Sequence, residues 1–184
     1  RNTVAVSTIG TTEIGRRGEN RDMQRILFLY LNTGGGHISG ARALKSGIES
    51  LNPREAEGFL LHGFPKHMAL DRLLMEEGYS LAINHFMPGF VLVYRMARRR
   101  GLISLSQEST AQRCAGYIAN YIRKHEITKV VCLHFILEKA AQMAIHQVNP
   151  GIPLATVVMD PFTVPPIWFG VKDQDFSVFS ERAR

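Results

Sequence analysis

Several residue patterns that commonly identify a function are missing from this chain of 184 residues. It has only two cysteines, Cys114 and Cys132, which lie far apart in a helical and a strand context. They predict a reducing compartment, no disulfide framework and no metal site. No apolar run approaches the roughly 18 residues that a membrane-spanning helix needs. The motifs of P-loop proteins, of serine hydrolases with a nucleophile elbow and of zinc proteases are also absent.

Acidic residues are fewer than basic ones: the chain has 16 Asp and Glu residues and 22 Lys and Arg residues, which gives a net charge of +6. Either this excess reflects ordinary solubility, or it indicates an anionic partner such as a phosphate group or an acidic lipid. We expect no nucleic-acid partner, because the arginines cluster beside apolar residues and no nucleic-acid-binding motif is present. The chain begins at Arg1 and shows no signal peptide, and we expect it to be a fragment of a longer protein.

Continuous apolar runs alternate with amphipathic segments from residue 25 onward. Residues 1–24 have little periodicity and are predicted to be a flexible lead-in. The remaining residues, 25–184, are predicted to form one domain. Strands are predicted at 25–31, 57–61, 128–133, 154–159 and 176–179, and helices at 38–51, 66–77, 107–124 and 137–148. The pattern predicts an α/β fold with a Rossmann-like parallel sheet and helices on both faces.

A run of three glycines lies between the first predicted strand and the helix that follows it. The segment reads Asn32, Thr33, Gly34, Gly35, Gly36 and His37. Consecutive glycines permit positive φ and remove every Cβ, so that a ligand can lie against bare backbone at the positive end of a helix. Histidine titrates near neutral pH and is suited to proton transfer. A tight turn with a surface histidine is the alternative.

The carboxyl ends of the predicted strands carry three titratable side chains, namely His37, His134 and Asp160. Ligands of open parallel sheets bind at that edge, so we expect a site there. It is not a dinucleotide site, because Ser39 stands where the third glycine of the fingerprint belongs and His62 stands where an acid would hold the ribose.

The segment from Asn32 to His37, after a buried strand and before a small-residue helix, resembles the N-terminal domain of the monogalactosyldiacylglycerol synthase and processive diacylglycerol glucosyltransferase family. A second motif agrees with it. Asp160 follows a buried strand, and Thr163, Pro166, Trp168 and Phe169 come after it, as in the family. The chain departs from the family at Pro165, where a histidine is usual, and at Met159, where a threonine is usual.

The resemblance implies that this chain is the acceptor-side half of a GT-B glycosyltransferase. The implied reaction is inverting transfer of a hexose from a UDP-sugar to a diacylglycerol-type lipid, without a metal or other cofactor. The donor would bind to a second domain that this chain lacks, so the chain alone is expected to be inactive. The implied location is the cytoplasmic face of a bacterial membrane or the plastid envelope, as a peripheral membrane protein.

Two residues compete for the role of general base towards the acceptor hydroxyl. His37 is placed to take that proton, while Asp160 is either the base or the group that orients the histidine, unless it merely caps its strand. The glycine loop from Asn32 to Gly36 would bind acceptor or phosphate. His134, Thr163 and Trp168 are expected to line the cleft, although His134 could be structural and Trp168 could be a packing residue.

Residues 86–100 combine apolar side chains with an arginine cluster. Phe90, Arg98, Arg99 and Arg100 are expected to contact an anionic membrane surface, unless the apolar residues are buried core. A second class of function also remains open. A basic α/β domain could bind a phosphorylated or anionic ligand without catalysing any reaction.

Overall fold

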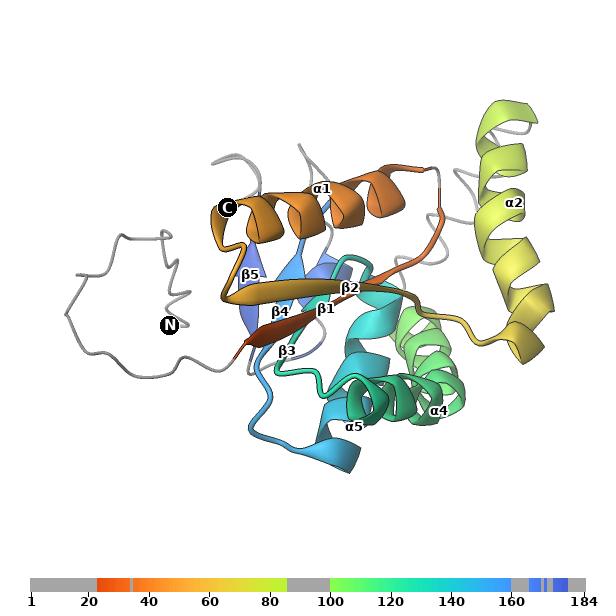
Figure 1. The fold of residues 1–184 in the computed structure, drawn as a ribbon. Helices are drawn as coiled ribbons and strands as arrows, with labels where there is room; N and C mark the ends of the chain where they lie inside the picture. The colour runs from red at the N-terminus through yellow and green to blue at the C-terminus, as the bar shows by residue number, and fades with distance from the viewer. Residues whose placement is uncertain are drawn as a thin grey trace, which may run out of the picture.

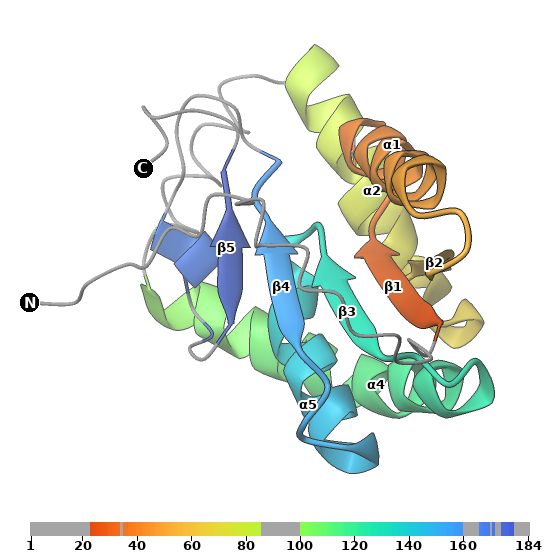
Figure 2. The same ribbon diagram turned by 60° about the vertical axis from the view of Figure 1, so that its left-hand side comes forward.

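A parallel sheet of five strands forms the centre of the domain in a computed structural model, which describes residues 23–33, 35–85, 100–159, 166–169, 171 and 174–178. The strands, side by side in Figure 2, follow the order β2-β1-β3-β4-β5. Every neighbouring pair is parallel. The strands are β1 (Gln24–Tyr30), β2 (Ala56–His62), β3 (Lys129–Cys132), β4 (Leu154–Val157) and β5 (Asp175–Ser177). The predicted α/β fold is confirmed.

Helices cover both faces of this sheet. One face is covered by α1 (Gly36–Leu51), and the other by α4 (Arg100–Lys124) and α5 (Glu138–Val148), as Figure 1 shows. A further helix, α2 (Ala69–His85), stands beyond the end of the sheet where β1 leads into α1. Short 3-10 turns are η1 (Lys66–Met68), η2 (Phe135–Leu137) and η3 (Pro166–Phe169).

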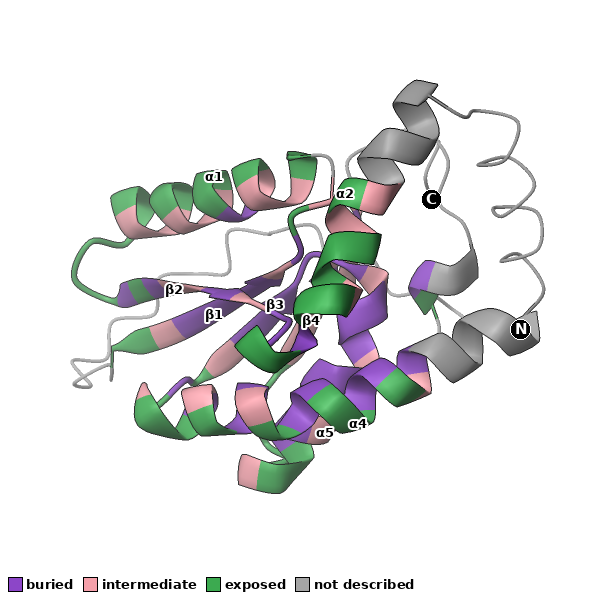
Figure 3. Cartoon of the chain, turned by 90° about the vertical axis from the view of Figure 1, so that its right-hand side faces the viewer, coloured by how far each residue is buried: buried purple, intermediate pink, exposed green. Residues whose placement is uncertain are grey.

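The core forms two layers because the strands are apolar on both faces. On β1, Leu27 and Leu29 belong to the layer beneath α4 and α5, while Ile26 and Phe28 belong to the layer beneath α1. Figure 3 shows the buried surface concentrated on the strands and on the sheet-facing sides of α4 and α5. Burial of this kind stabilises a parallel sheet by roughly 25 cal/mol for each Å² of apolar surface removed from water.

Two helices are longer than the sequence predicts, and one predicted core residue is exposed. Gly78 does not end α2, which continues to His85, because an interior glycine costs a helix only about 1 kcal/mol. The helix predicted to begin at residue 107 already begins at Arg100. Leu51, predicted to lie on the buried face of α1, is 80% exposed at the helix end. Residues 1–22 and 86–99, including Phe90, Arg98 and Arg99, lie outside the described residues.

Candidate functional site at the carboxyl edge of the sheet

The strand order places a topological switch point between the carboxyl ends of β1 and β3. After β1 the chain crosses through α1 to β2 on one side, and all later strands lie on the other side of β1. The connections on the two sides of this point cover opposite faces of the sheet, so the loops after β1 and β3 diverge. Ligands of open α/β sheets bind at such a switch point.

The glycine turn leads from β1 into α1 at this switch point. Gly35 is the N-cap of α1 and has φ +75°, in the left-handed region that favours glycine. A Cβ built on Gly36 would meet nothing within 4 Å, so the backbone there is open. Just before the turn, the hydroxyl oxygen of Thr33 is buried and has no hydrogen-bond partner. Gly34 lies outside the described residues.

His37 reaches from the first turn of α1 to the end of β3. Its Nδ1 lies 2.6 Å from the backbone oxygen of Leu133. A carbonyl oxygen only accepts, so Nδ1 carries the proton and donates it to this bond. In the neutral ring the lone pair is then on Nε2, the arrangement that a general base requires. The contact with β3 orients the ring.

His134 lies beside His37 and has the opposite tautomer. The two ring centroids are 4.7 Å apart, and the rings are inclined by 49°. The backbone N–H of Ile136 donates to Nδ1 of His134 at 3.3 Å, which leaves the proton of the neutral ring on Nε2. Burial, together with the nearby His37, lowers the pKa of His134 well below its ordinary value. The pair therefore presents one ring as a hydrogen-bond acceptor and the other as a neutral donor.

A buried polar row continues from His134 towards β5. The Cys132 thiol donates to the backbone oxygen of His134 at 3.2 Å, and the Thr156 hydroxyl donates to Oε1 of Gln174 at 2.7 Å. Between them lies Glu138, the first residue of α5, which is fully buried. Neither of its carboxyl oxygens has a hydrogen-bond partner.

Glu138 is held in its neutral form by this environment. Burial raises the pKa of its carboxyl to about 9, although the nearby Thr156 side chain partly offsets the effect. An ionised carboxylate without hydrogen bonds would be strongly disfavoured at such a position. Sequence reasoning missed Glu138, because an acid at the start of a helix looks like an ordinary first-turn residue.

Beyond the carboxyl ends of β1 and β2, α2 contributes a carboxylate that sequence reasoning also missed. Oε1 of Glu76 accepts from the backbone N–H of Asn32 at 3.1 Å and lies 2.5 Å from Nε2 of His62. Its Oε2 accepts from Nε of Arg72 at 3.1 Å. Burial raises the pKa of Glu76, but these hydrogen bonds outweigh that effect and the pKa falls below its ordinary value. No spacing in the sequence connects residues 32, 62 and 76.

The remaining predicted site residues are only partly described. Trp168 in η3 is 1% exposed, and its ring meets that of Phe135 edge-on at 5.5 Å. Phe135 in turn stacks on His134 at 4.7 Å, so Trp168 supports the histidine pair from behind. Asp160 and Thr163 lie outside the described residues. Arg100 is the first residue of α4.

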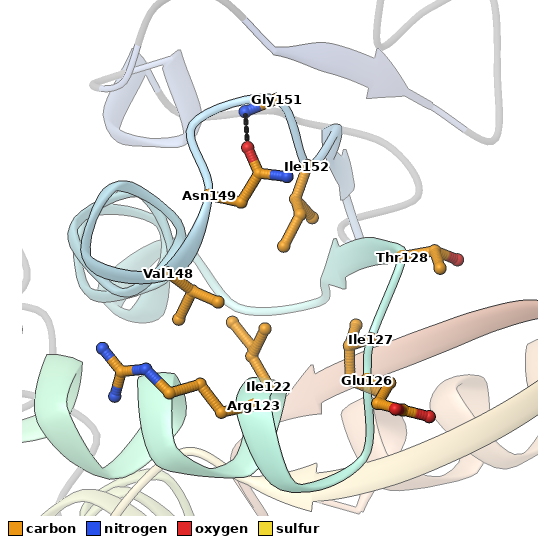
Figure 4. A pocket seen from close by; sticks show the side chains of 9 residues that line it. All are labelled: Ile122, Arg123, Glu126, Ile127, Thr128, Val148, Asn149, Gly151 and Ile152. Carbon is orange, nitrogen blue, oxygen red and sulfur yellow. Dashed lines mark hydrogen bonds between the residues drawn. The ribbon is translucent and has the colours of Figure 1, made fainter.

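A hollow in the described surface lies at the opposite edge of the sheet (Figure 4). It has a volume of about 480 Å³ and lies between the ends of α4 and α5. Ile122, Ile127, Val148 and Ile152 line it together with polar residues, of which Arg123 donates to the backbone oxygen of Gln147 and Asn149 accepts from Gly151. Ligands of open parallel sheets bind at the carboxyl ends of the strands, and this hollow lies at the amino ends, so we do not assign the site there.

Two features are absent from the described residues. No helix there has the length and apolarity to cross a membrane. Nor do the same residues include a group of three or more His, Cys, Asp or Glu side chains that could hold a metal ion. Both cysteines are free and buried, and burial raises the pKa of the Cys114 thiol to about 12.

The chain matches no protein-family model and no curated protein sequence. The likeness to the glycolipid-synthesising family therefore rests on its two sequence motifs alone.

Proposed function

We propose that this chain is the acceptor-side domain of a glycolipid-synthesising glycosyltransferase, which transfers a hexose from a UDP-sugar to a diacylglycerol-type lipid with inversion. The observation that carries the proposal is the geometry of His37. Its ring lies at the switch point of the sheet, and the 2.6 Å contact with the backbone oxygen of Leu133 fixes its tautomer. A hydroxyl acceptor at Nε2 would meet an oriented base beside open glycine backbone.

The chemistry of such a transfer fits the groups around His37. The base takes the acceptor proton as the acceptor oxygen attacks the anomeric carbon, and the bond to the diphosphate breaks. The neutral His134 ring offers a hydrogen-bond donor beside the base without adding a competing positive charge. The first amides of α1 and its dipole favour a negative group at the same edge, so that no metal is needed there.

The donor would bind to a second domain facing this edge across a cleft. In support of that division, β2 ends at His62 instead of at an acid that could hold a ribose, and His62 is already engaged by Glu76. Positioning of the sugar carbon supplies much of the rate in transfer reactions. We therefore expect the isolated chain to bind UDP-sugars weakly and to be inactive, which calorimetric titration with UDP-glucose and UDP-galactose tests.

An exposed leucine face supports contact with a lipid surface. Leu70, Leu73 and Leu74 of α2 are 67%, 49% and 64% exposed. Leu73 and Leu74 come three and four positions after Leu70, so the three side chains lie on one side of the helix. Together with the net charge of +6, this face suits an anionic bilayer surface. The sequence adds an arginine cluster at 98–100, of which residues 98 and 99 lie outside the described residues. We place the protein at a membrane surface as a peripheral protein, on the cytoplasmic side or at the plastid envelope.

The decisive experiment is a transfer assay with the natural full-length protein. Labelled UDP-glucose or UDP-galactose is supplied with diacylglycerol in mixed vesicles, and labelled glycolipid is measured. Glycolipid formation supports the transferase. Binding of phosphorylated ligands without any transfer would instead support a non-catalytic module, for which the open glycine turn is the favourable observation.

A further inference from the structure

We propose that Glu76 is a positioning residue, which couples the contact of α2 with a lipid surface to the geometry of the glycine turn and thereby to His37. The inference rests on the proposed lipid contact of α2. It goes further by assigning the path through which that contact reaches the site and the side chain that carries it.

The two faces of α2 have different roles. On the outer face, Leu70, Leu73 and Leu74 are exposed. On the inner face, Met75 packs against the core beneath α4, and Asp71 and Glu76 make ion pairs with other elements. Ordering of the leucine face by a lipid surface would therefore act on the body of the domain through these inner side chains.

Among the described side chains of α2, residues 69–78, it is Glu76 whose polar contact reaches the candidate site. Glu76 accepts from the backbone N–H of Asn32, between the end of β1 and the glycine turn. The same oxygen contacts His62 at the end of β2, so that one carboxylate joins two neighbouring strand ends to α2. The side chain of Glu76 is only 10% exposed, and its bond to the backbone of Asn32 lies at the surface of the domain.

The route from Asn32 to His37 is short and passes through the glycine turn. Gly35 adopts the left-handed conformation, and the backbone at Gly36 is open. Such a turn has many conformations available to it, so a bond that holds Asn32 narrows the range of entry angles of α1. Because His37 is in the first turn of α1, its approach to Leu133 depends on that entry angle.

The chain provides a matched control on the same helix. Asp71 accepts two hydrogen bonds from the guanidinium of Arg113 on α4, at 2.6 and 2.8 Å. This pair also anchors α2, but to α4 and away from the glycine turn. Removing it tests whether any lost anchor of α2 has the same effect as the loss of Glu76.

The test is amide hydrogen exchange of residues 32–38 in the full-length protein, with and without vesicles of phosphatidylglycerol and phosphatidylcholine. In the wild-type protein, vesicles should slow exchange in this segment by about threefold or more, the response expected when a local opening is suppressed. Glu76→Ala should bind vesicles but lose the slowing. Glu76→Gln, which retains an acceptor oxygen for Asn32, should keep most of it, and Asp71→Ala should keep it fully.

Activity gives a second readout, because Glu76→Ala should lower kcat on lipid vesicles with little change in vesicle binding. Wild-type protein that binds vesicles without any slowing would overturn the coupling but leave the lipid contact intact. Equal losses in Glu76→Ala and Asp71→Ala would also overturn it, since Glu76 would then merely hold α2 in place. Wild-type protein that ignores vesicles would overturn both proposals.

Discussion

The two edges of the sheet differ in how completely their polar groups are paired. At the amino edge, Arg25 bonds the backbone oxygen of His125 and the carboxylate of Glu126, and the Thr128 hydroxyl accepts from the Arg25 N–H. Arg123 is similarly occupied by Asn120 and Gln147. These bonds tie the strand entries to the loop between α4 and β3, and they serve the fold.

The carboxyl edge contains groups that the fold does not satisfy. Among the described residues, the buried side-chain oxygens without a hydrogen-bond partner belong to Thr33 and Glu138, both near the carboxyl ends of β1, β3 and β4. His37 and His134 lie between them. Buried polar groups are usually paired, so unpaired ones indicate strain or a function.

Depth alone does not locate a site in this fold. The 480 Å³ hollow lies at the amino edge, where none of the buried side-chain oxygens or nitrogens of the described residues lacks a partner. The histidine pair lies at the carboxyl edge, beside the topological switch point and near the unpaired oxygens of Thr33 and Glu138. Three pairs of substitutions test this difference between the two edges. Each pair consists of a residue at the carboxyl edge and a control residue elsewhere.

The largest effect is expected from Glu138 as the pH changes. In the folded chain this carboxyl keeps its proton up to a pKa of about 9, whereas in the unfolded chain it ionises near 4.5. The folded state binds the extra proton between these values, so stability falls as the pH rises from about 5 to 9. Each pH unit in this range lowers the free energy of unfolding by about 1.4 kcal/mol, so the total loss of stability is several kcal/mol.

Glu138→Gln should flatten this slope, because the amide has no proton to lose. Urea unfolding at pH 5, 7 and 9 measures the slope. The free energy of unfolding of the variant should rise relative to that of the wild type as the pH rises. Glu126→Gln at the amino edge, where the Glu126 side chain is 79% exposed, should keep the wild-type slope. An unchanged slope in Glu138→Gln would show that the carboxyl does not hold its proton in the fold.

The next effect concerns catalysis in the full-length protein. His37→Ala should lower hexosyl transfer by roughly two orders of magnitude, the usual scale for loss of a general base. Affinity for the UDP-sugar should hardly change, because the donor is proposed to bind elsewhere. Arg123→Ala, in the wall of the hollow, should leave the rate near that of the wild type.

Steady-state kinetics of both variants decides between the two edges. A nearly normal rate in His37→Ala would remove His37 from the role of base and return Asp160 to consideration. A large loss in Arg123→Ala with an intact fold would move the site to the hollow.

The smallest effects distinguish a glycine of the turn from a glycine of the adjoining helix. Gly35→Ala should destabilise the fold by about 1 kcal/mol, because an alanine Cβ disfavours the left-handed conformation at φ +75°. Gly47→Ala should stabilise it by about 1 kcal/mol, since Gly47 is helical and its Cβ would meet nothing within 4 Å. Urea unfolding at neutral pH resolves both. A neutral Gly35→Ala would mean that the turn does not require a left-handed residue.

Much of the architecture was predictable from local pattern. Continuous apolar runs bounded by turn residues predicted the strands, and steps of three and four predicted the buried face of α4, where Ala111, Cys114 and Ile118 are fully buried. Their periodicity is a property of neighbouring residues, so it is visible in the sequence. The same holds for the glycine turn, whose placement after a strand and before a helix put His37 at the carboxyl edge.

The pairings within the site were decided by the tertiary structure alone. His37 meets Leu133 across 96 positions, and Asn32 meets Glu76 across 44, distances at which no local pattern survives. The tautomers of His37 and His134 follow from backbone groups that reach them only after β1 and β3 pair. The neutral state of Glu138 likewise comes from its burial beneath β3 and β4, whereas in the sequence it is one more acid at a helix start.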